Sequence, residues 1–227
     1  MITILQIETA TQVCSAAISQ DGKTIALKEE MASNIHAGSL TLFIQSVMDT
    51  AGLKFSALDA IAVSKGPGSY TGLRIGVSTA KGLCFALDKP LIGIDTLQMM
   101  AEGFLKAEPD HEGLICSMID ARRMEVFTAV FDAQLDYVSP VEAKIIDEKS
   151  FESLLTANQV TFIGDGAAKC AETLTHENAH FSTANYNSAG NMSHLAMQAY
   201  TQGKFEDVAY FEPFYLKDFV FTTPKKK

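Results

Sequence analysis

A glycine-rich stretch is the part of the sequence best suited to hold an anion. Gly66-Pro67-Gly68-Ser69-Tyr70-Thr71-Gly72 follows a predicted strand and precedes a predicted helix. Its backbone N–H groups and the N-terminus of the helix would point at one spot where a phosphate could sit, and Arg74 would add a positive charge there. No G-K-[ST] sequence closes the loop, so it is not a Walker loop. A purely structural tight turn is the alternative. The residues of the anion-binding hypothesis are Gly66, Gly68, Ser69, Thr71 and Arg74.

Two acidic residues stand where predicted strands end. Glu8 follows the first strand of the chain, and Asp120 follows a similar strand about 112 residues later. In a two-lobed ATPase such carboxylates could hold a magnesium-bound water beside a nucleotide. They could equally form hydrogen bonds with their neighbouring turns. Both interpretations stay open at the level of the sequence.

His176-Glu177-Asn178-Ala179-His180 matches the H-E-x-x-H pattern of zinc peptidases. That pattern works when a helix places both imidazoles on one face and the glutamate acts as base. Here polar residues surround the segment, and no amphipathic stripe passes through it. We therefore expect a surface loop and no metal site.

The elements that would position these groups repeat. A strand ending at Glu8, a strand over residues 13–19, an Asp-Gly turn and a strand through Ile25 and Leu27 predict a three-stranded meander. The same order returns in residues 114–119, 125–131 and 135–141. Two meanders of one kind predict a duplicated fold.

Helices and strands alternate after each meander, which predicts an α/β protein. Apolar residues at helical spacing run from Leu40 to Ala51, with Gly52 as the expected cap, and the chain continues with strand 60–64, helix 71–87, strand 91–94 and helix 96–106. The second half predicts helix 151–157, strand 160–163, a loop at 164–166 and helix 191–203. The polar stretch 106–112 is the expected boundary, giving an N-terminal lobe at 1–108 and a C-terminal lobe at 109–227. The last helix and the tail could pack back on the first lobe.

The helix predicted at residues 71–87 is weakly polar on every side. Leu73, Val77 and Cys84 lie on one stripe, whereas Ile75 and Leu83 lie elsewhere. One sheet cannot cover both sides. Either the helix is fully buried, or its second side packs on a partner subunit.

Composition narrows the classes of partner. The 227 residues carry a formal net charge of −9, so the chain should not hold nucleic acid well by itself. The four cysteines are far apart in apolar surroundings, which favours reduced thiols in the core. Neither a membrane span nor a signal peptide is evident, and we expect a cytoplasmic protein without membrane attachment.

Several strings resemble the TsaB (YeaZ) family closely. They are GPGSYTGLRIGVSTAKGL at residues 66–83, ILQIETA at 4–10 and DARRMEVF at 120–127, supported by IGIDTL at 92–97, GDGA at 164–167 and PFYLK at 213–217. The first string is highly specific. The resemblance covers nearly the whole chain and is loosest at about 142–191.

The resemblance implies a two-lobed actin-like ATPase (ribonuclease H-like) fold with duplicated mixed-sheet lobes and flanking helices. It also implies a role in threonylcarbamoyladenosine synthesis on tRNAs that read codons beginning with A. In that system the related TsaD subunit transfers the threonylcarbamoyl group, TsaB pairs with TsaD, and the ATPase TsaE joins them. No tightly bound cofactor is expected, although ATP or ADP could bind at the interface of the complex, and tRNA would bind only through the complex.

The comparison with TsaD implies that this chain is not catalytic by itself. The two metal-binding histidines of TsaD would fall at about Thr96 and Met100, and a hydroxyl and a thioether cannot replace two imidazoles. The family's partner-facing surface is formed by the first two helices. This implies that the partner-binding residues are Leu40, Phe43, Val47, Ile75, Gly76, Thr79 and Leu83. A chain without its partner should form homodimers, because an uncovered apolar face tends to self-associate.

Two other functions compete with this interpretation. One is a metal-dependent hydrolase or glycoprotease-like peptidase acting through His176 and His180. The other is a stand-alone nucleotide-binding switch that uses Glu8, Asp120 and the two glycine loops.

Overall fold

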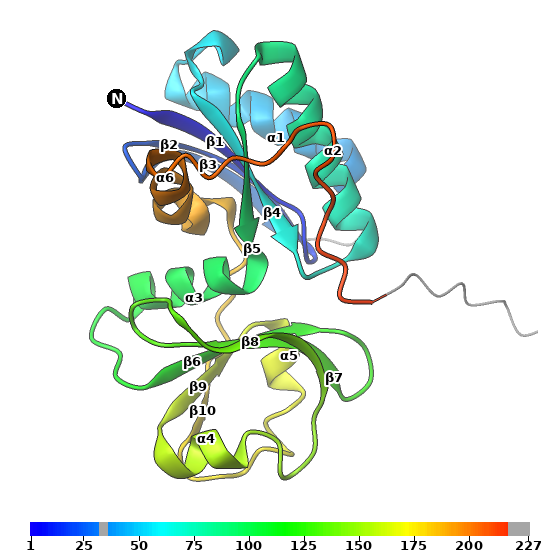
Figure 1. Cartoon of the computed structure of the whole chain (residues 1–227), viewed down its shortest axis with the longest axis vertical. Coiled ribbons are helices and arrows are strands. Elements are labelled where there is room, and N and C mark those ends of the chain that lie inside the picture. Colours follow the sequence, from blue (N-terminus) through cyan, green and yellow to red (C-terminus); the bar gives the residue numbers. More distant parts are fainter. Residues whose placement is uncertain (32–35, 218–227) are drawn as a thin grey trace, which may run out of the picture.

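Each half of the chain begins with the predicted antiparallel meander, and each meander is the start of a five-stranded sheet (Figure 1). The computed structural model describes residues 1–31 and 36–217. The first sheet has the order β3-β2-β1-β4-β5, and the second has the order β10-β9-β6-β7-β8. Counted from the meander outward, the two orders are identical, so the predicted duplication is confirmed.

The first sheet contains β1 (Thr3–Glu8), β2 (Val13–Gln20), β3 (Lys23–Met31), β4 (Ala60–Gly66) and β5 (Leu91–Asp95). Strand β1 lies at its centre, antiparallel to β2 and parallel to β4, with Leu5 facing Ile18 on one side and Ile61 on the other. All six of its residues are buried. A strand buried on both faces is expected to be apolar throughout, and β1 departs from this at Thr3, Gln6 and Glu8.

Three helices follow the strands of the first half: α1 (His36–Ala51), α2 (Tyr70–Leu87) and α3 (Thr96–Ala107), with a short 3-10 turn η1 (Phe55–Ala57) before β4. Helix α1 ends before Gly52, which has φ +65°, as the predicted cap requires. The Asp95 carboxylate caps α3 by accepting hydrogen bonds from the backbone N–H groups of Leu97 and Gln98.

The second sheet contains β6 (Leu114–Asp120), β7 (Glu125–Phe131), β8 (Tyr137–Ile145), β9 (Val160–Ile163) and β10 (Ala179–Phe181). Its helices are α4 (Glu152–Ala157), α5 (Asp165–Ala168) and α6 (Ser193–Thr201), the last preceded by the 3-10 turn η2 (Ala189–Met192). The connections therefore correspond one to one, but α5 has 4 residues where α2 has 18.

Four predictions for the second half are wrong in detail. Asp165 and Gly166, in the predicted loop 164–166, begin helix α5, and the last helix starts with a 3-10 turn and ends at Thr201. Strand β8 extends to Ile145, and Pro140 is tolerated within it because β8 lies at the edge of the sheet. Strand β10 lies where a surface loop was predicted.

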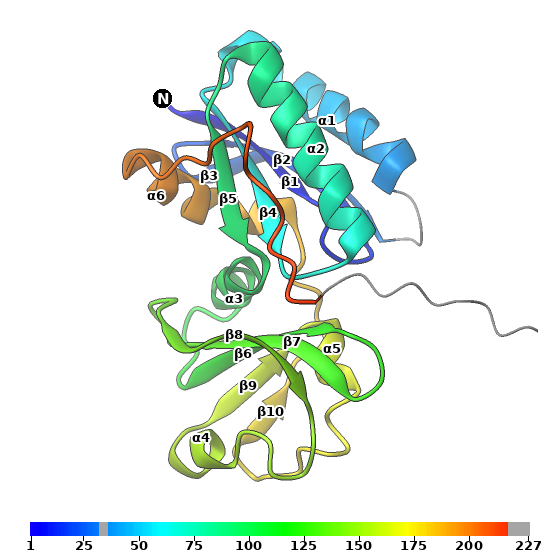
Figure 2. The same cartoon turned by 45° about the vertical axis from the view of Figure 1, so that its right-hand side comes forward.

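Three apolar clusters hold the structure together. One lies between the first sheet and helices α1 and α2, and another lies beneath α4 and α5. The third runs without interruption from Ile4 and Ile92 of the first sheet, through α3, to Ile115 and Phe131 of the second. Helix α3 packs on β6 and β7, while α6 packs on β1 and β5 (Figure 2). Each half thus places its last helix against the sheet of the other half.

Among the helices in the described ranges 1–31 and 36–217, none is both long enough and apolar enough to cross a bilayer.

Candidate functional site

A cleft of about 720 Å³ opens where strands of both sheets end. The β1–β2 turn contributes Ala10 and Thr11, and the second sheet contributes Asp120 and Arg122 from the β6–β7 turn and Asp165 from α5. The start of α2 adds Gly68, Ser69, Tyr70, Thr71, Gly72 and Ile75. The cleft therefore joins the glycine-rich stretch to one of the two acids selected from the sequence.

The glycine-rich loop is folded against the protein's own backbone. Ser69 N donates a hydrogen bond to Ala10 O at 2.6 Å, and Gly72 N donates to the side chain of Ser69 at 3.3 Å. A Cβ atom at Gly68 would lie 2.4 Å from Ala10 O, and one at Gly72 would lie 2.0 Å from Thr9 O. These glycines are therefore required for close packing on the β1–β2 turn, and two of the loop's N–H groups already have partners.

Arg74 does not point into the loop. Its guanidinium lies over the ring of Tyr70, 4.3 Å from the centroid, and its Nε donates to the Tyr215 hydroxyl at 3.3 Å. Tyr70 and Tyr215 also stack, with their ring centroids 4.8 Å apart. Gly66 is likewise covered by the chain's last described segment, since a Cβ there would meet Phe214 O at 2.7 Å. Neither residue lines the cleft.

Glu8 is enclosed within the protein. Its side chain is fully buried, and its carboxylate accepts a hydrogen bond from Ala10 N. The other carboxylate oxygen, Oε2, has no hydrogen-bond partner among the described residues. Burial raises the pKa of Glu8 to about 7, and the hydrogen bond from Ala10 opposes this shift. Glu8 therefore does not line the cleft.

Asp120 has the opposite environment. It is exposed, and it forms an ion pair with Lys169. The same ammonium group donates to Arg123 O at 2.6 Å and to Glu125 O at 2.7 Å. Asp120 also accepts a hydrogen bond from Arg122 N at 2.8 Å. It therefore bonds to its own neighbouring turn, which is the second of the two interpretations left open by the sequence.

The H-E-x-x-H segment is not helical. His176 precedes a turn, His180 lies within β10, and His176 Nδ1 accepts a hydrogen bond from Asn178 N at 3.1 Å. The helical face that would bring both imidazoles to one ion is therefore absent. Within residues 1–31 and 36–217, no group of three or more potential metal ligands comes together.

The first two helices lie side by side over one face of the first sheet (Figure 2). Four residues predicted to contact a partner are instead part of the core: Leu40, Phe43, Val47 and Gly76. A Cβ at Gly76 would lie 2.2 Å from Thr9 Oγ1, so this glycine permits contact with the sheet and not with another subunit. These four residues therefore face the sheet within this chain, and their contact with a partner stays a prediction.

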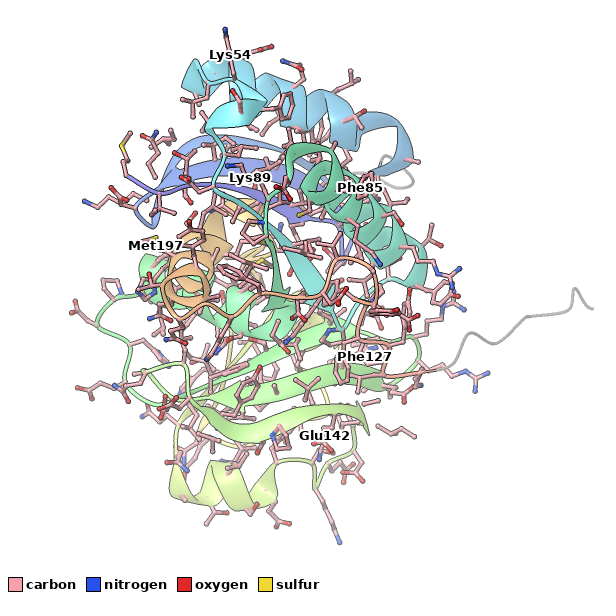
Figure 3. All side chains as sticks on the ribbon, turned by 45° about the horizontal axis from the view of Figure 1, so that its top comes forward. Lys54, Phe85, Lys89, Phe127, Glu142 and Met197 are labelled. Atoms are coloured by element: carbon pink, nitrogen blue, oxygen red, sulfur yellow. The ribbon has the colours of Figure 1, made fainter. Side chains whose placement is uncertain are left out.

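Ile75, Thr79 and Leu83 remain half-buried at the edge of the outer side of α2. Two large apolar residues of these helices that are exposed were missed. Phe85 of α2 is 86% exposed and Leu42 of α1 is 68% exposed, and Figure 3 labels Phe85 in the upper lobe. The signal was present in the sequence, since both residues lie off the stripes that face the sheet.

The positions at which the resemblance places the metal-binding histidines of TsaD are closed to solvent. Thr96 and Met100 are both fully buried at the start of α3. Met100 belongs to the cluster that joins the two sheets.

A second, more polar cavity of about 560 Å³ lies beyond α3, between β5, α6 and Tyr137 of β8.

Comparison with known proteins agrees with this fold. The family model described as "TsaD: tRNA N6-adenosine threonylcarbamoyltransferase" matches residues 27–223. The tRNA threonylcarbamoyladenosine biosynthesis protein TsaB of Escherichia coli is 36% identical over 128 residues, which cover 56% of this chain and 54% of that protein. The Bacillus subtilis TsaB is 34% identical over 131 residues, covering 57% and 55%. The alignments thus span about half the length of these curated relatives.

The solved structure of YeaZ from Pseudomonas aeruginosa superposes with a TM-score of 0.80 at 26% identity, covering 95% of this chain and 100% of that one. Component A of (R)-2-hydroxyglutaryl-CoA dehydratase from Acidaminococcus fermentans shares the fold, with a TM-score of 0.53 at 12% identity. The two-lobed actin-like α/β fold is confirmed by these neighbours. The chain therefore belongs to the family described by the tRNA N6-adenosine threonylcarbamoyltransferase (TsaD) model and, within it, to the TsaB (YeaZ) group.

Proposed function

We propose that this chain is a non-catalytic subunit required for threonylcarbamoylation of the adenosine next to the anticodon in tRNAs that read codons starting with A. It would act by binding and supporting TsaD, together with TsaE. The pathway is that of the TsaB relatives, which are tRNA threonylcarbamoyladenosine biosynthesis proteins. ATP or ADP would bind at the interface of the complex, and the isolated chain would form homodimers.

The observation that carries the proposal is the uncovered apolar surface of α1 and α2. We give the name outer helix face to five residues of these helices that the sheet does not bury: Leu42 and Phe85, which are exposed, and Ile75, Thr79 and Leu83, which are half-buried. A phenylalanine that is 86% exposed has no role in the core of this chain. Gly82 lies between Thr79 and Phe85, and a Cβ there would have no neighbour within 4 Å. Large apolar anchors next to small residues are typical of helix surfaces that receive another subunit.

A second observation favours the role of a non-catalytic subunit over that of an enzyme. On the side of the first sheet, the cleft offers a loop in which Ser69 N and Gly72 N bond to the chain itself, and Glu8 is buried away from it. Thr96 and Met100 lie within the core, where a substrate would not reach them. The groups that could perform transfer would then come from the partner.

The experiment is a co-purification of this chain with TsaD from the same organism, followed by an assay of tRNA threonylcarbamoylation. Phe85→Glu is a sharper probe than a change at Leu83, because Leu83 also packs on the core. We expect Phe85→Glu to weaken binding by about 30-fold or more, as is typical for a central interface residue, and to reduce activity in proportion. Its thermal stability should match the wild type.

The matched control is Ile145→Glu, since Ile145 is a large apolar residue with 73% exposure on strand β8 of the second sheet. This variant should bind TsaD normally. Size-exclusion chromatography of each variant alone tests the homodimer. Full binding and activity of Phe85→Glu would reject the outer helix face as the partner site, and full activity of TsaD without the chain would reject the function.

A further inference from the structure

Each of the three arginines of the chain either lines the cleft or lies next to a residue that does, in a region that we call the rim. The 227 residues include Arg74, Arg122 and Arg123 and no others. Arg122 lines the cleft together with Tyr70, and Arg74 lies over the ring of that same tyrosine. All three side chains are exposed. Arginine occurs only three times in the chain, each time at this rim. This suggests a function for which lysine is not suited.

The acids around this rim are largely neutralised by lysines. Lys169 pairs with Asp120, and Lys217 pairs with Glu125. Within residues 1–31 and 36–217, none of the three arginines forms an ion pair. The carboxylates of Asp165, in the cleft, and Glu212, near Arg74, remain. The rim therefore presents three guanidinium groups against two carboxylates, in a chain whose formal net charge is −9.

The two neighbouring arginines are held in an unusual backbone conformation. Arg122 has φ +72° and Arg123 has φ +51°, a left-handed region that few residues other than glycine adopt. Lys169 holds this turn by donating to Arg123 O and Glu125 O, and Glu125 N donates to Arg122 O at 3.2 Å. Such a conformation persists only where surrounding contacts impose it, and it often marks a functional turn.

The surroundings distinguish between two kinds of phosphate ligand. A nucleotide in the cleft would use the N–H groups of the glycine-rich loop, but Ser69 N and Gly72 N already have partners, and Arg74 is stacked outside the loop. The arginines instead face solvent along the rim. Exposed, planar guanidinium groups suit the bidentate contacts made to successive phosphates of a polyanion.

We propose that Arg74, Arg122 and Arg123 form a binding site for backbone phosphates of a folded RNA. This proposal rests on the proposed function, which supplies a tRNA as the RNA. The acidic remainder of the chain opposes RNA binding, so the affinity of the chain alone would be weak and strongly dependent on salt. In the complex the site would orient RNA that the partner also holds.

The test uses Arg122→Gln/Arg123→Gln, with Lys23→Gln/Lys54→Gln as the matched control. Both pairs remove two positive charges from exposed positions. Lys23 and Lys54 lie near the end of β1 that is remote from the cleft, where Thr3 pairs with Gln20, and Figure 3 labels Lys54 at the top of the upper lobe. Fluorescence anisotropy of a labelled tRNA transcript is measured over a salt series, with the full chain alone at low salt and with the TsaD complex.

We expect the arginine variant to bind RNA about 10-fold more weakly at low salt, and the slope of log K against log salt to fall by about 2. The lysine control should change neither the slope nor the affinity by as much. The proposal is overturned if both double variants behave alike, if the wild-type chain does not bind at low salt, or if ADP displaces the RNA, which would indicate a nucleotide site. Co-purification of the arginine variant with TsaD separates these outcomes from failure of the proposed function.

Discussion

Glu8 and Asp120 occupy the same position in two copies of one motif, at the end of the first strand of each meander, yet their environments are opposite. Glu8 is fully buried, whereas Asp120 is exposed and paired with Lys169. The difference arises from what covers the two strand ends. An 18-residue helix with a glycine-rich start packs against the first, and the 4-residue α5 leaves the second open. Duplicated topology therefore does not imply duplicated chemistry.

The largest effect on stability should come from the second glycine in the loop that follows β4, Gly68, and from its counterpart after β9, Gly166. A Cβ at Gly68 would lie 2.4 Å from Ala10 O, whereas one at Gly166 would lie 2.9 Å from the nearest atom, the backbone carbon of Ile119. We expect Gly68→Ala to lower the free energy of unfolding by about 3 kcal/mol and Gly166→Ala by about 1 kcal/mol, because the tighter site must move backbone. Chemical denaturation measures both.

Gly82→Ala is the control for the helix itself. Gly82 lies within α2 with open space around it, so alanine there should stabilise the protein by up to about 1 kcal/mol. Equal losses in the free energy of unfolding at Gly68 and Gly166 would show that the two loops are packed alike. This result would contradict the difference between the two strand ends.

The second effect concerns the dependence of stability on pH. The pKa of Glu8 is about 7 in the folded protein and close to its ordinary value of 4.5 when unfolded. The folded state therefore binds the extra proton between these values, and stability should fall as pH rises from 4.5 to 7, by about 3 kcal/mol in total.

Glu8→Gln should remove this dependence and be the more stable protein above pH 7. Asp120→Asn is the counterpart in the second meander and should leave the dependence in place. Denaturation curves at several pH values decide the matter, and a wild-type stability that rises between pH 5 and 7 would contradict the burial of a neutral Glu8.

The smallest effect belongs to the exposed acid. Lys169→Met would break the ion pair with Asp120 and remove the donor to two backbone carbonyl groups, so we expect a loss of about 1 kcal/mol. Asp120→Asn alone should cost less than about 0.5 kcal/mol, because exposed ion pairs contribute little. If the two losses are equal, the lysine acts through the carboxylate and not by holding the turn.

Much of this fold could be predicted from the sequence. The meanders, the α/β alternation, the cap at Gly52 and the duplication all depend on local pattern, which a single sequence contains. Strand β10 and helix α5 were missed because each is held by tertiary contacts instead of by its own periodicity.

The candidate site was less predictable. The family resemblance identified α1 and α2 as the partner-facing helices but not which of their residues the sheet covers, so Leu40 and Val47, which are buried, were named and Phe85 was overlooked. Arg74 was placed in the glycine loop because sequence proximity does not reveal a distant tyrosine, and Tyr215 lies 141 residues away. Orientation and long-range contact are the two properties that spacing does not encode.

The exchange of last helices between the halves has a consequence for how the chain could be divided. A fragment ending at residue 108 would carry α3 without β6 and β7, and a fragment beginning at 109 would carry α6 without β1 and β5. Each would expose the surface that the other covers, including parts of the cluster from Ile4 to Phe131. The two pieces should be poorly folded when expressed singly and should recover the native form when mixed, which makes residue 108 a site for conditional reassembly by fragment complementation.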